Sequence, residues 1–209
     1  MITMAQFFAI HTENPQLRLI RRAVEIIRKG GIIVYPTDSS YAIACHIGDK
    51  QALDVIRRIR QLDDKHNFTL VCMDLAQVST FAKIGNDAYR TIKALTPGPF
   101  TFILGATREV PRRLQHPKKK TVGVRIPNHQ IALLLVQELA EPLFTTSLIL
   151  PGDSEGLSDP YVIRERLEHE VDLIIDAGII DFKETTIIEF SKAGPEIIRQ
   201  GIGIAPMLD

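Results

Sequence analysis

Short apolar runs alternate with amphipathic stretches along nearly the whole chain, and this alternation constrains the fold more than any single motif. Apolar residues recur at helical spacing from Leu17 to Ile27, and Gly30-Gly31 ends that stretch. The apolar run at 32–35 has the length of a buried strand. Strands that alternate with helices are typical of an α/β sheet. We therefore expect an α/β fold with roughly eight strands and about five helices.

The expected strands are placed by their apolar composition and by the turn residues that bound them. They are 32–35, 41–45, 68–73, 100–104, 121–126, 143–150, 171–175, 185–190 and 196–199. Helix starts are expected at Asn14-Pro15, Asp49, Asn86, Asn128 and Asp159-Pro160, which carry capping residues. The last strands follow one another without a helix between them, which indicates antiparallel pairing. The sheet is therefore predicted to be mixed, with parallel and antiparallel neighbours.

Composition and charge exclude several classes of protein. Apolar residues make up 45% of the chain and charged residues 24%, as in ordinary globular domains. Lys and Arg number 25 and so do Asp and Glu, so any binding of nucleic acid or nucleotide must come from a local concentration of charge. No apolar run approaches membrane-spanning length, and residues 1–10 do not resemble a signal peptide. Without a linker, we expect one domain over 1–209, cytoplasmic and without a membrane partner.

The common cofactor motifs are missing from the sequence. There is no GxxxxGK[ST] loop, no GxGxxG after the first strand and no GxSxG elbow. No two histidines stand at metal-ligand spacing, so we expect no metal site, and nothing indicates zinc, haem or NAD. Cys45 and Cys72 lie far apart in apolar segments, which predicts two buried free thiols in a reducing cytosol.

A polar segment, Tyr35-Pro-Thr-Asp-Ser-Ser-Tyr41, follows a strand expected near the centre of the sheet. Loops at strand ends in open α/β sheets form ligand crevices, which makes the hydroxyl groups of this segment candidate ligand contacts. The alternative is a polar turn in which Asp38 and the hydroxyls bond only the local backbone. Spacing alone slightly favours the turn.

Two further segments concentrate cations. Arg57, Arg58 and Arg60 end a predicted helix, where cations complement the helix dipole. Because the three point to different sides, Arg58 and Arg60 are also candidates for anion binding. The stretch 108–120 carries the largest local charge imbalance, with Glu109 as its only acid. It is either a solvated loop or a surface for duplex backbone or triphosphate. Its RNA-binding candidates are Arg112, Arg113, Lys118, Lys119 and Lys120.

A lone arginine, Arg125, lies inside an apolar strand pattern. An unpaired buried charge is costly, so Arg125 should meet a carboxylate or a bound anion, and composition does not decide between an internal partner and a ligand. Thr145-Thr146-Ser147 end another apolar strand, where their hydroxyl and backbone groups could face the same crevice.

Seven segments in order resemble the YrdC/YciO family, which includes threonylcarbamoyl-adenylate synthases. The family patterns are YPTDTVYGLG, KxR, PGPxT, VRxPxH, TSANxSG, STV and a late RxG. The matching segments are 35–44 (YPTDSSYAIA), 58–60 (RIR), 97–101 (PGPFT), 124–129 (VRIPNH), 146–152 (TSLILPG), 185–187 (TTI) and 199–201 (RQG). The resemblance covers nearly the whole chain, and the TSLILPG segment is most similar to the YciO branch.

The resemblance implies an open, twisted mixed sheet flanked by helices, with a concave basic cleft. In the synthases, bicarbonate carboxylates threonine on nitrogen, and the carbamate attacks the α-phosphate of ATP and releases pyrophosphate, with Mg²⁺ as a companion of ATP. The product serves formation of N6-threonylcarbamoyladenosine in tRNA. Carried over by position, Thr37, Ser39 and Tyr41 would contact the amino acid. Near phosphates or carboxylate would lie Arg58, Arg60, Arg125, Ser147 and Arg199.

Departures from the family pattern leave two functions open. Arg58 replaces the lysine of KxR, Ile149 replaces the asparagine of SxN, and Pro151 replaces the second serine. An aliphatic group in place of an amide removes hydrogen bonds that an enzyme would need. The chain is thus either a nucleotidyltransferase, a weak or altered L-threonylcarbamoyladenylate synthase, or a non-catalytic module that binds double-stranded RNA or tRNA. The substrate, the RNA preference and the oligomeric state stay open.

Overall fold

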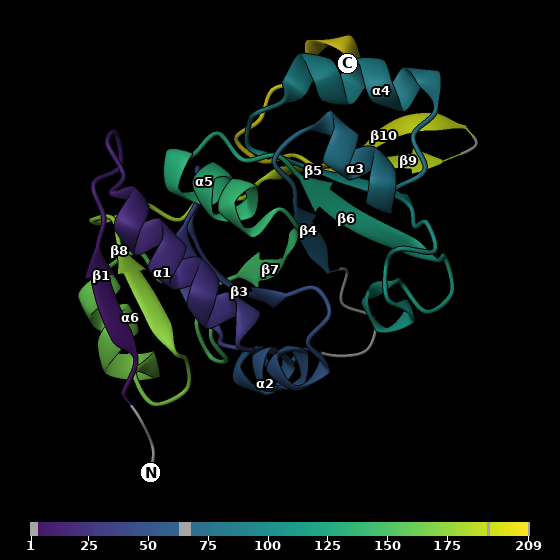
Figure 1. The fold of residues 1–209 in the computed structure, drawn as a ribbon. Helices are drawn as coiled ribbons and strands as arrows, with labels where there is room; N and C mark the ends of the chain where they lie inside the picture. The colour runs from purple at the N-terminus through teal and green to yellow at the C-terminus, as the bar shows by residue number, and fades with distance from the viewer. Residues whose placement is uncertain (1–3, 63–67, 192, 209) are drawn as a thin grey trace.

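The computed structural model describes residues 4–62, 68–191 and 193–208. Within these residues ten strands form one sheet in the order β1-β8-β2-β3-β7-β4-β6-β5-β9-β10 (Figure 1). The strands are β1 (Gln6–Ala9), β2 (Ile33–Pro36), β3 (Tyr41–His46), β4 (Thr69–Val71), β5 (Phe100–Gly105), β6 (Thr121–Arg125), β7 (Leu143–Ser147), β8 (Leu173–Asp176), β9 (Thr186–Ser191) and β10 (Gly194–Arg199). The sheet combines parallel pairs such as β4–β6 with antiparallel pairs such as β3–β7, which confirms the open mixed sheet.

The helices of the described residues connect these strands. They are α1 (Leu17–Arg28), α2 (Lys50–Arg60), α3 (Leu75–Phe81), α4 (Asn86–Leu95), α5 (Gln130–Leu139) and α6 (Pro160–Leu167), with short 3₁₀ turns η1 (Arg112–Leu114) and η2 (Pro206–Leu208). None of the helices described is long and apolar enough to cross a bilayer.

Several sequence predictions of local structure are confirmed. The Asp49 carboxylate accepts from the Ala52 N–H at 2.9 Å, and Asp159 caps α6 by accepting from the Tyr161 N–H at 2.8 Å. The predicted pairing of the last strands is confirmed by the antiparallel β9–β10 ladder. Cys45 and Cys72 are buried free thiols, and burial raises the pKa of each to about 12.

Other boundaries differ from the predictions. Helix α1 begins at Leu17 rather than at Asn14-Pro15, because Gln16 is the residue with extended backbone at its start. The caps of α4 and α5 are Gly85 and His129, one residue to either side of the predicted ones. Strand β1 and helix α3 were not expected. β1 is an edge strand that pairs only with β8, and α3 spans seven residues, so neither carries a long periodic pattern.

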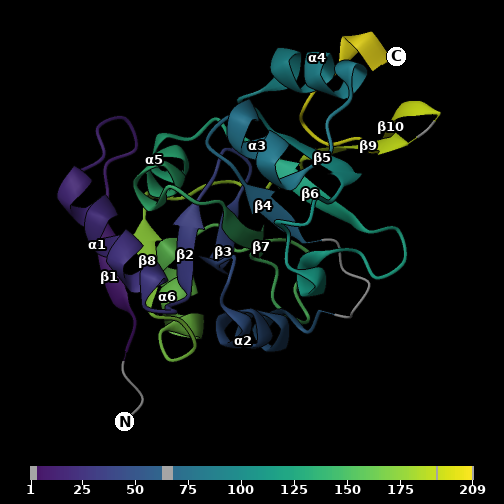
Figure 2. The same ribbon diagram turned by 45° about the vertical axis from the view of Figure 1, so that its right-hand side comes forward.

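The two faces of the sheet are covered unequally, and this creates the site. On one face, residues of α2, α3, α4 and α6 share a continuous core with side chains from β2 through β9. On the other face, α1 and α5 pack together over β8, β2 and β3 (Figures 1 and 2). This second core also includes Val71 of β4 and Leu143 of β7, but the rest of the same face, across β7, β4, β6, β5 and β9, is not part of it. We call this part the open face.

The open face can be followed through the strand register. Thr69 on β4 lies opposite Thr145 on β7 and beside Gly123 on β6, and Gly123 lies opposite Ile103 on β5. Ile103 in turn pairs with Glu189 on β9. Because paired residues in neighbouring strands point to the same side, these five positions form one row across the open face.

Candidate functional site

A pocket of about 210 Å³ lies on the open face, and its lining reaches from β2 to β10. Its lining combines hydroxyl groups, aliphatic groups and three guanidinium groups, and no carboxylate among the described residues belongs to it. The hydroxyl residues are Tyr35, Thr37, Ser40, Thr69, Thr101, Thr145, Thr146, Ser147 and Thr185. The remaining lining residues are Ala42, Ile103, Gly123, Ile149, Ile187 and Ile198, with Arg60, Arg125 and Arg199 as the cations. This lining suits an anionic ligand.

Arg60 supplies the cation of the pocket with the fewest protein partners. It is the last residue of α2, and Gln61 ends the helix in left-handed conformation. The side chain of Arg60 forms no hydrogen bond or ion pair with any residue in the described ranges, and its Nε is buried without a partner. Burial lowers the pKa of its guanidinium. A half-buried cation without an internal partner is a favourable contact for a bound anion.

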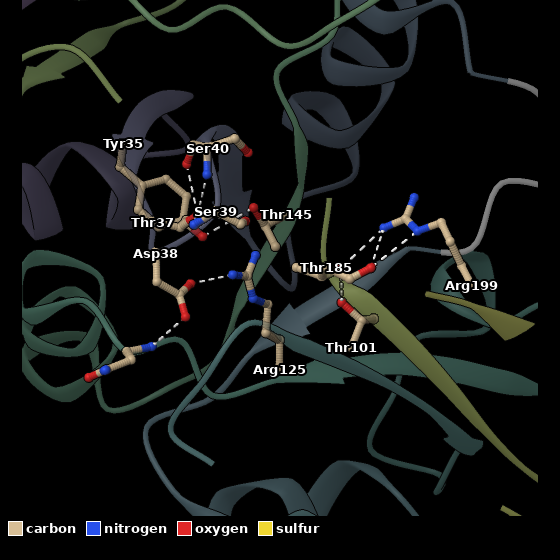
Figure 3. Close-up of polar contacts among 11 residues, drawn as sticks. Tyr35, Thr37, Asp38, Ser39, Ser40, Thr101, Arg125, Thr145, Thr185 and Arg199 are labelled. Carbon is tan, nitrogen blue, oxygen red and sulfur yellow. Dashed lines mark hydrogen bonds and ion pairs between the residues drawn. The ribbon is translucent and has the colours of Figure 1, made fainter. Parts of the chain in front are cut away.

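Arg125 has an internal partner, which decides the question left open by the sequence. Its Nη2 donates to the Asp38 carboxylate, and the other Asp38 oxygen accepts from the Asn128 N–H at 2.9 Å (Figure 3). The Arg125 and Asp38 side chains are only 9% and 11% exposed. The Arg125 Nε is buried without a partner. Asp38 therefore fixes the guanidinium at the pocket wall.

Arg199 is oriented by a separate network at the far end of the pocket (Figure 3). Its Nη2 donates to the carbonyl of Thr185 at 3.0 Å and to the Thr185 hydroxyl at 3.2 Å. The Thr185 hydroxyl also lies 3.0 Å from that of Thr101. Nη1 of Arg199 forms an ion pair with Glu184 at 2.8 Å. These contacts hold the guanidinium in place before any ligand binds.

The polar segment at 37–40 forms a local turn. The Thr37 hydroxyl donates to the Ser40 carbonyl at 2.7 Å and accepts from the N–H groups of Ser39 and Ser40, each at 3.2 Å. The turn alternative is thus correct for the Thr37 hydroxyl, although the residue also lines the pocket. Ser39 is buried and does not belong to the lining.

Besides Ser39, two predicted site residues lie away from the pocket. Tyr41 points to the opposite face from its neighbour Ala42, since residues alternate along a strand. Its hydroxyl donates to the Gly178 carbonyl at 2.8 Å and accepts from the Ala177 N–H at 3.0 Å. Arg58 is exposed and pairs with Glu170 at 3.2 Å.

Helix geometry explains the position of Arg58. Residues two apart on a helix are about 200° apart around its axis, so Arg58 and Arg60 face opposite directions. Ser147 and Arg199, by contrast, line the pocket as expected. Of the eight predicted contacts, the structure therefore brings together Thr37, Arg60, Arg125, Ser147 and Arg199.

The basic stretch at 108–120 lines a different surface. Arg112 and Lys120 share a groove with Lys83 and Arg108, and this groove has no lining residue in common with the pocket. Nη2 of Arg113 donates to the Gly48 carbonyl at 2.6 Å, which ties η1 to the loop before α2. Lys119 pairs with Glu189, and Lys118 is exposed. The basic stretch at 108–120 and the three arginines of the pocket therefore lie on separate surfaces and do not line one cleft.

Comparison with known proteins identifies the family once this geometry is known. Residues 25–201 match the sequence pattern of the Sua5/YciO/YrdC family, whose description reads "Telomere recombination". The chain belongs to the Sua5/YciO/YrdC family. It is 53% identical to YciO of Escherichia coli (strain K12) over 206 residues, covering 98% of this chain and 100% of YciO. The crystal structure of E. coli YciO superimposes with a TM-score of 0.94 at 52% identity, covering 99% of this chain and all of that one.

More distant members of the Sua5/YciO/YrdC family carry a named activity. The threonylcarbamoyl-AMP synthase of Coxiella burnetii (strain RSA 493 / Nine Mile phase I) is 29% identical over 183 residues, covering 86% of this chain and 96% of the synthase. P. abyssi Sua5, whose structure is complexed with L-threonine, superimposes with a TM-score of 0.85 at 26% identity. That match covers 93% of this chain and 57% of Sua5. The resemblance and the fold expected from the sequence are thereby confirmed.

Sequence reasoning missed several pocket residues. Thr101 and Thr185 belong to the PGPFT and TTI segments that match the Sua5/YciO/YrdC family, but neither was singled out as a contact. A threonine two residues after PGP and another directly before a strand were the available signals. Ile103 and Ile198 gave no signal. Ile103 faces the pocket through its place in the β5–β9 register, and Ile198 lies at the irregularity of β10, which the sequence does not indicate.

Proposed function

We propose that the pocket binds the phosphates of ATP and that the protein is a weak or altered L-threonylcarbamoyladenylate synthase. The observation that carries this proposal is the half-buried guanidinium of Arg60, which has no partner among the described residues and faces a pocket without carboxylates. Arg125 and Arg199 are held in place by their own partners, so their charges are oriented before the ligand arrives. Preoriented charges stabilise phosphoryl transfer.

Threonine is the proposed second substrate, by analogy with P. abyssi Sua5 and its bound L-threonine. The hydroxyl groups of Thr145 and Ser147, which point to the same side of β7, form a polar wall next to the Asp38–Arg125 pair. A carbamate formed on the amino acid would attack the α-phosphate of ATP while pyrophosphate leaves. Arg60 and Arg199 are the cations that would neutralise negative charge on the leaving phosphates.

The lining does not by itself form a magnesium site. Mg²⁺ is usually bound through one or two carboxylates together with substrate phosphates. Asp38 is engaged by Arg125 and Asn128, and the described residues contain no cluster of three or more His, Cys, Asp or Glu that could hold a metal ion. We therefore assign no protein ligand to Mg²⁺, which fits this pocket only as a companion of the ATP phosphates.

The matched pair Arg60 and Arg58 tests the proposal, because both lie in the last turn of α2 and only Arg60 reaches the pocket. ATP binding is measured by calorimetry, and pyrophosphate release is measured with threonine, bicarbonate and ATP. We expect Arg60→Ala to weaken ATP binding about tenfold. Arg58→Ala should bind ATP like the wild type. An absence of ATP binding by the wild type, or equal losses in both variants, overturns the proposal.

Binding of double-stranded RNA or tRNA is the second candidate function. It is favoured by the groove lined by Lys83, Arg108, Arg112 and Lys120, which has no acidic lining residue among those described. Cations that follow a groove suit a phosphate backbone. Because the groove and the pocket share no residue, RNA binding and ATP binding can be tested by separate substitutions.

A further inference from the structure

An ion pair lies on the open face directly beside the pocket. Ile103 lines the pocket, and Glu189 lies opposite it in the β5–β9 ladder, so both side chains point to the same side of the sheet. The Glu189 carboxylate accepts from the Lys119 ammonium at 2.7 Å. The Glu189 side chain is 20% exposed, whereas that of Lys119 is 58% exposed. Lys119 thus holds a cation on the open face, beside the strand position next to the pocket residue Ile103.

A hydrogen-bonded turn presents Lys119 from the basic stretch. The Nδ1 atom of His116 accepts from the N–H groups of Lys118 and Lys119, at 3.2 and 3.1 Å. Lys120 has a φ of 55°, and its N–H donates to the His116 carbonyl at 3.0 Å. The turn leads directly into β6, which contributes Gly123 and Arg125 to the pocket. The backbone of Lys119 is therefore fixed, while its long side chain can change direction.

The charges of the pocket indicate what Lys119 could do. Arg125 and Arg199 are neutralised by Asp38 and Glu184, which leaves Arg60 as the pocket cation without a carboxylate partner among the described residues. A triphosphate carries several negative charges, which a single guanidinium does not balance. Lys119 is a further cation on the open face, because its partner Glu189 lies opposite the pocket residue Ile103 in the strand register.

We propose that Lys119 is a phosphate-binding residue of this pocket, and that its ion pair with Glu189 is the resting arrangement that an incoming polyphosphate replaces. The inference rests on the proposed function, since it needs a polyphosphate ligand. The pair is partly exposed, and ion pairs in contact with solvent contribute little stability, so its exchange costs little. The partial exposure of Glu189 lets water solvate its carboxylate once Lys119 has moved.

Lys118 offers a matched control, because it has the same charge, belongs to the same turn and is exposed, with no ion pair to any residue described. Affinities for ATP, ADP and AMP are measured by calorimetry at fixed ionic strength for the wild type, Lys119→Ala, Lys119→Arg, Lys118→Ala and Glu189→Gln. We expect Lys119→Ala to weaken ATP binding about tenfold and AMP binding much less, since a charge-assisted contact to the phosphate tail is lost. Lys119→Arg should retain most of the affinity.

Glu189→Gln separates the proposed exchange from a structural role. Without the competing carboxylate, Lys119 is free for the ligand, so ATP binding should become tighter; weaker binding in this variant overturns the inference. Equal ATP affinities of the wild type, Lys119→Ala and Lys118→Ala also overturn it, while a loss in Arg60→Ala in the same experiment leaves the proposed function intact. Should Lys119→Ala fail to fold, Lys119→Met and Lys119→Arg make the same comparison. If the wild type does not bind ATP, the proposed function itself fails.

Discussion

Asp38 and Arg125 form a buried ion pair that joins two distant parts of the chain at the wall of the pocket. Asp38 lies in the turn after β2, and Arg125 is the last residue of β6. The second oxygen of Asp38 bonds the Asn128 N–H, so one carboxylate fixes the loop before α5 as well. The shape of the pocket therefore depends on a contact between two residues that are 87 positions apart in the sequence.

Asp38→Ala should strongly destabilise the protein. The substitution leaves the buried Arg125 guanidinium without a carboxylate and the Asn128 N–H without its acceptor. Removing one member of a buried pair costs about 3–5 kcal/mol. Urea denaturation measures the free energy of unfolding. Asp153→Ala is the control, because the Asp153–Arg166 pair is partly exposed and should contribute no more than about 1 kcal/mol. Equal losses of unfolding free energy in the two variants would contradict a stabilising role of the buried Asp38–Arg125 pair.

The stability of the protein should fall in mild acid because of His129. Burial lowers the pKa of His129, and its Nδ1 atom has no hydrogen-bond partner in the described structure. The unfolded chain, with an ordinary histidine pKa of about 6.5, then binds a proton that the folded protein does not bind. Folding stability contributed by the neutral ring is therefore present above about pH 6.5 and is lost as the pH falls below it.

The measurement for His129 is urea denaturation between about pH 5 and 8. His129→Gln should show a shallower decline towards acid than the wild type, by at most about 1.4 kcal/mol per pH unit for one proton. His169→Gln is the control, because His169 is exposed and should keep the wild-type slope. Parallel profiles for the wild type and His129→Gln would mean that this ring does not govern the acid response.

Local signals in the sequence predict much of the fold because they act over a few residues. Asp49 and Asp159 cap their helices through bonds to residues two or three positions away, so the sequence contains both partners. Strand β1 escapes such reasoning, since Gln6–Ala9 becomes a strand only through its pairing with β8, more than 160 residues later. The mixed sheet was predictable, whereas its strand order was not.

The candidate site is less predictable because it depends on the direction in which each side chain points from its helix or strand. Arg58 and Arg60 both supply a cation to the KxR segment, but only their direction around the helix axis decides which of them faces the pocket. Tyr41 matches the family pattern too, but side chains alternate along β3, so Tyr41 points into the core. The partner of Arg125 could be expected as a type of residue, a carboxylate, but its identity as Asp38 requires the folded chain.

Duplex RNA, if bound, should follow the groove of Arg112 and Lys120, and its affinity should fall with salt. Each neutralised phosphate contributes roughly −0.9 to the log–log slope on duplex DNA, and we expect similar behaviour on RNA. The double variant Arg112→Ala/Lys120→Ala should therefore bind duplex RNA more weakly at low salt. Its log–log slope of affinity against salt should also be shallower, by the contribution of about two phosphate contacts. Filter binding across a salt series measures both quantities.

The control for RNA binding is Arg60→Ala, which alters the pocket and leaves the groove unchanged. It should retain wild-type RNA affinity and salt dependence. RNA binding that does not depend on salt, or no RNA binding at low salt, would contradict the proposal that this groove binds the phosphate backbone of RNA.

Ile149 is the departure from the family pattern that the structure places directly in the pocket. It follows β7, and its N–H bonds the Ser147 carbonyl at 3.0 Å, which keeps the two residues in one tight turn. The synthases of the family have an amide at this position. An isoleucine can neither donate to a phosphate oxygen nor accept from an ammonium group, and its bulk excludes a water that could substitute for the amide.

Ile149→Asn should therefore increase threonylcarbamoyl-adenylate formation. Loss of one preorganised donor costs about 10²–10³ in rate, so restoring it should raise a weak activity by at least about tenfold. Product formation from threonine, bicarbonate and ATP is measured by chromatography, together with thermal stability. Ile187→Asn is the control, since it introduces the same amide elsewhere in the pocket and should give no gain. Robust wild-type turnover that Ile149→Asn leaves unchanged would show that the reaction relies on other residues of the pocket.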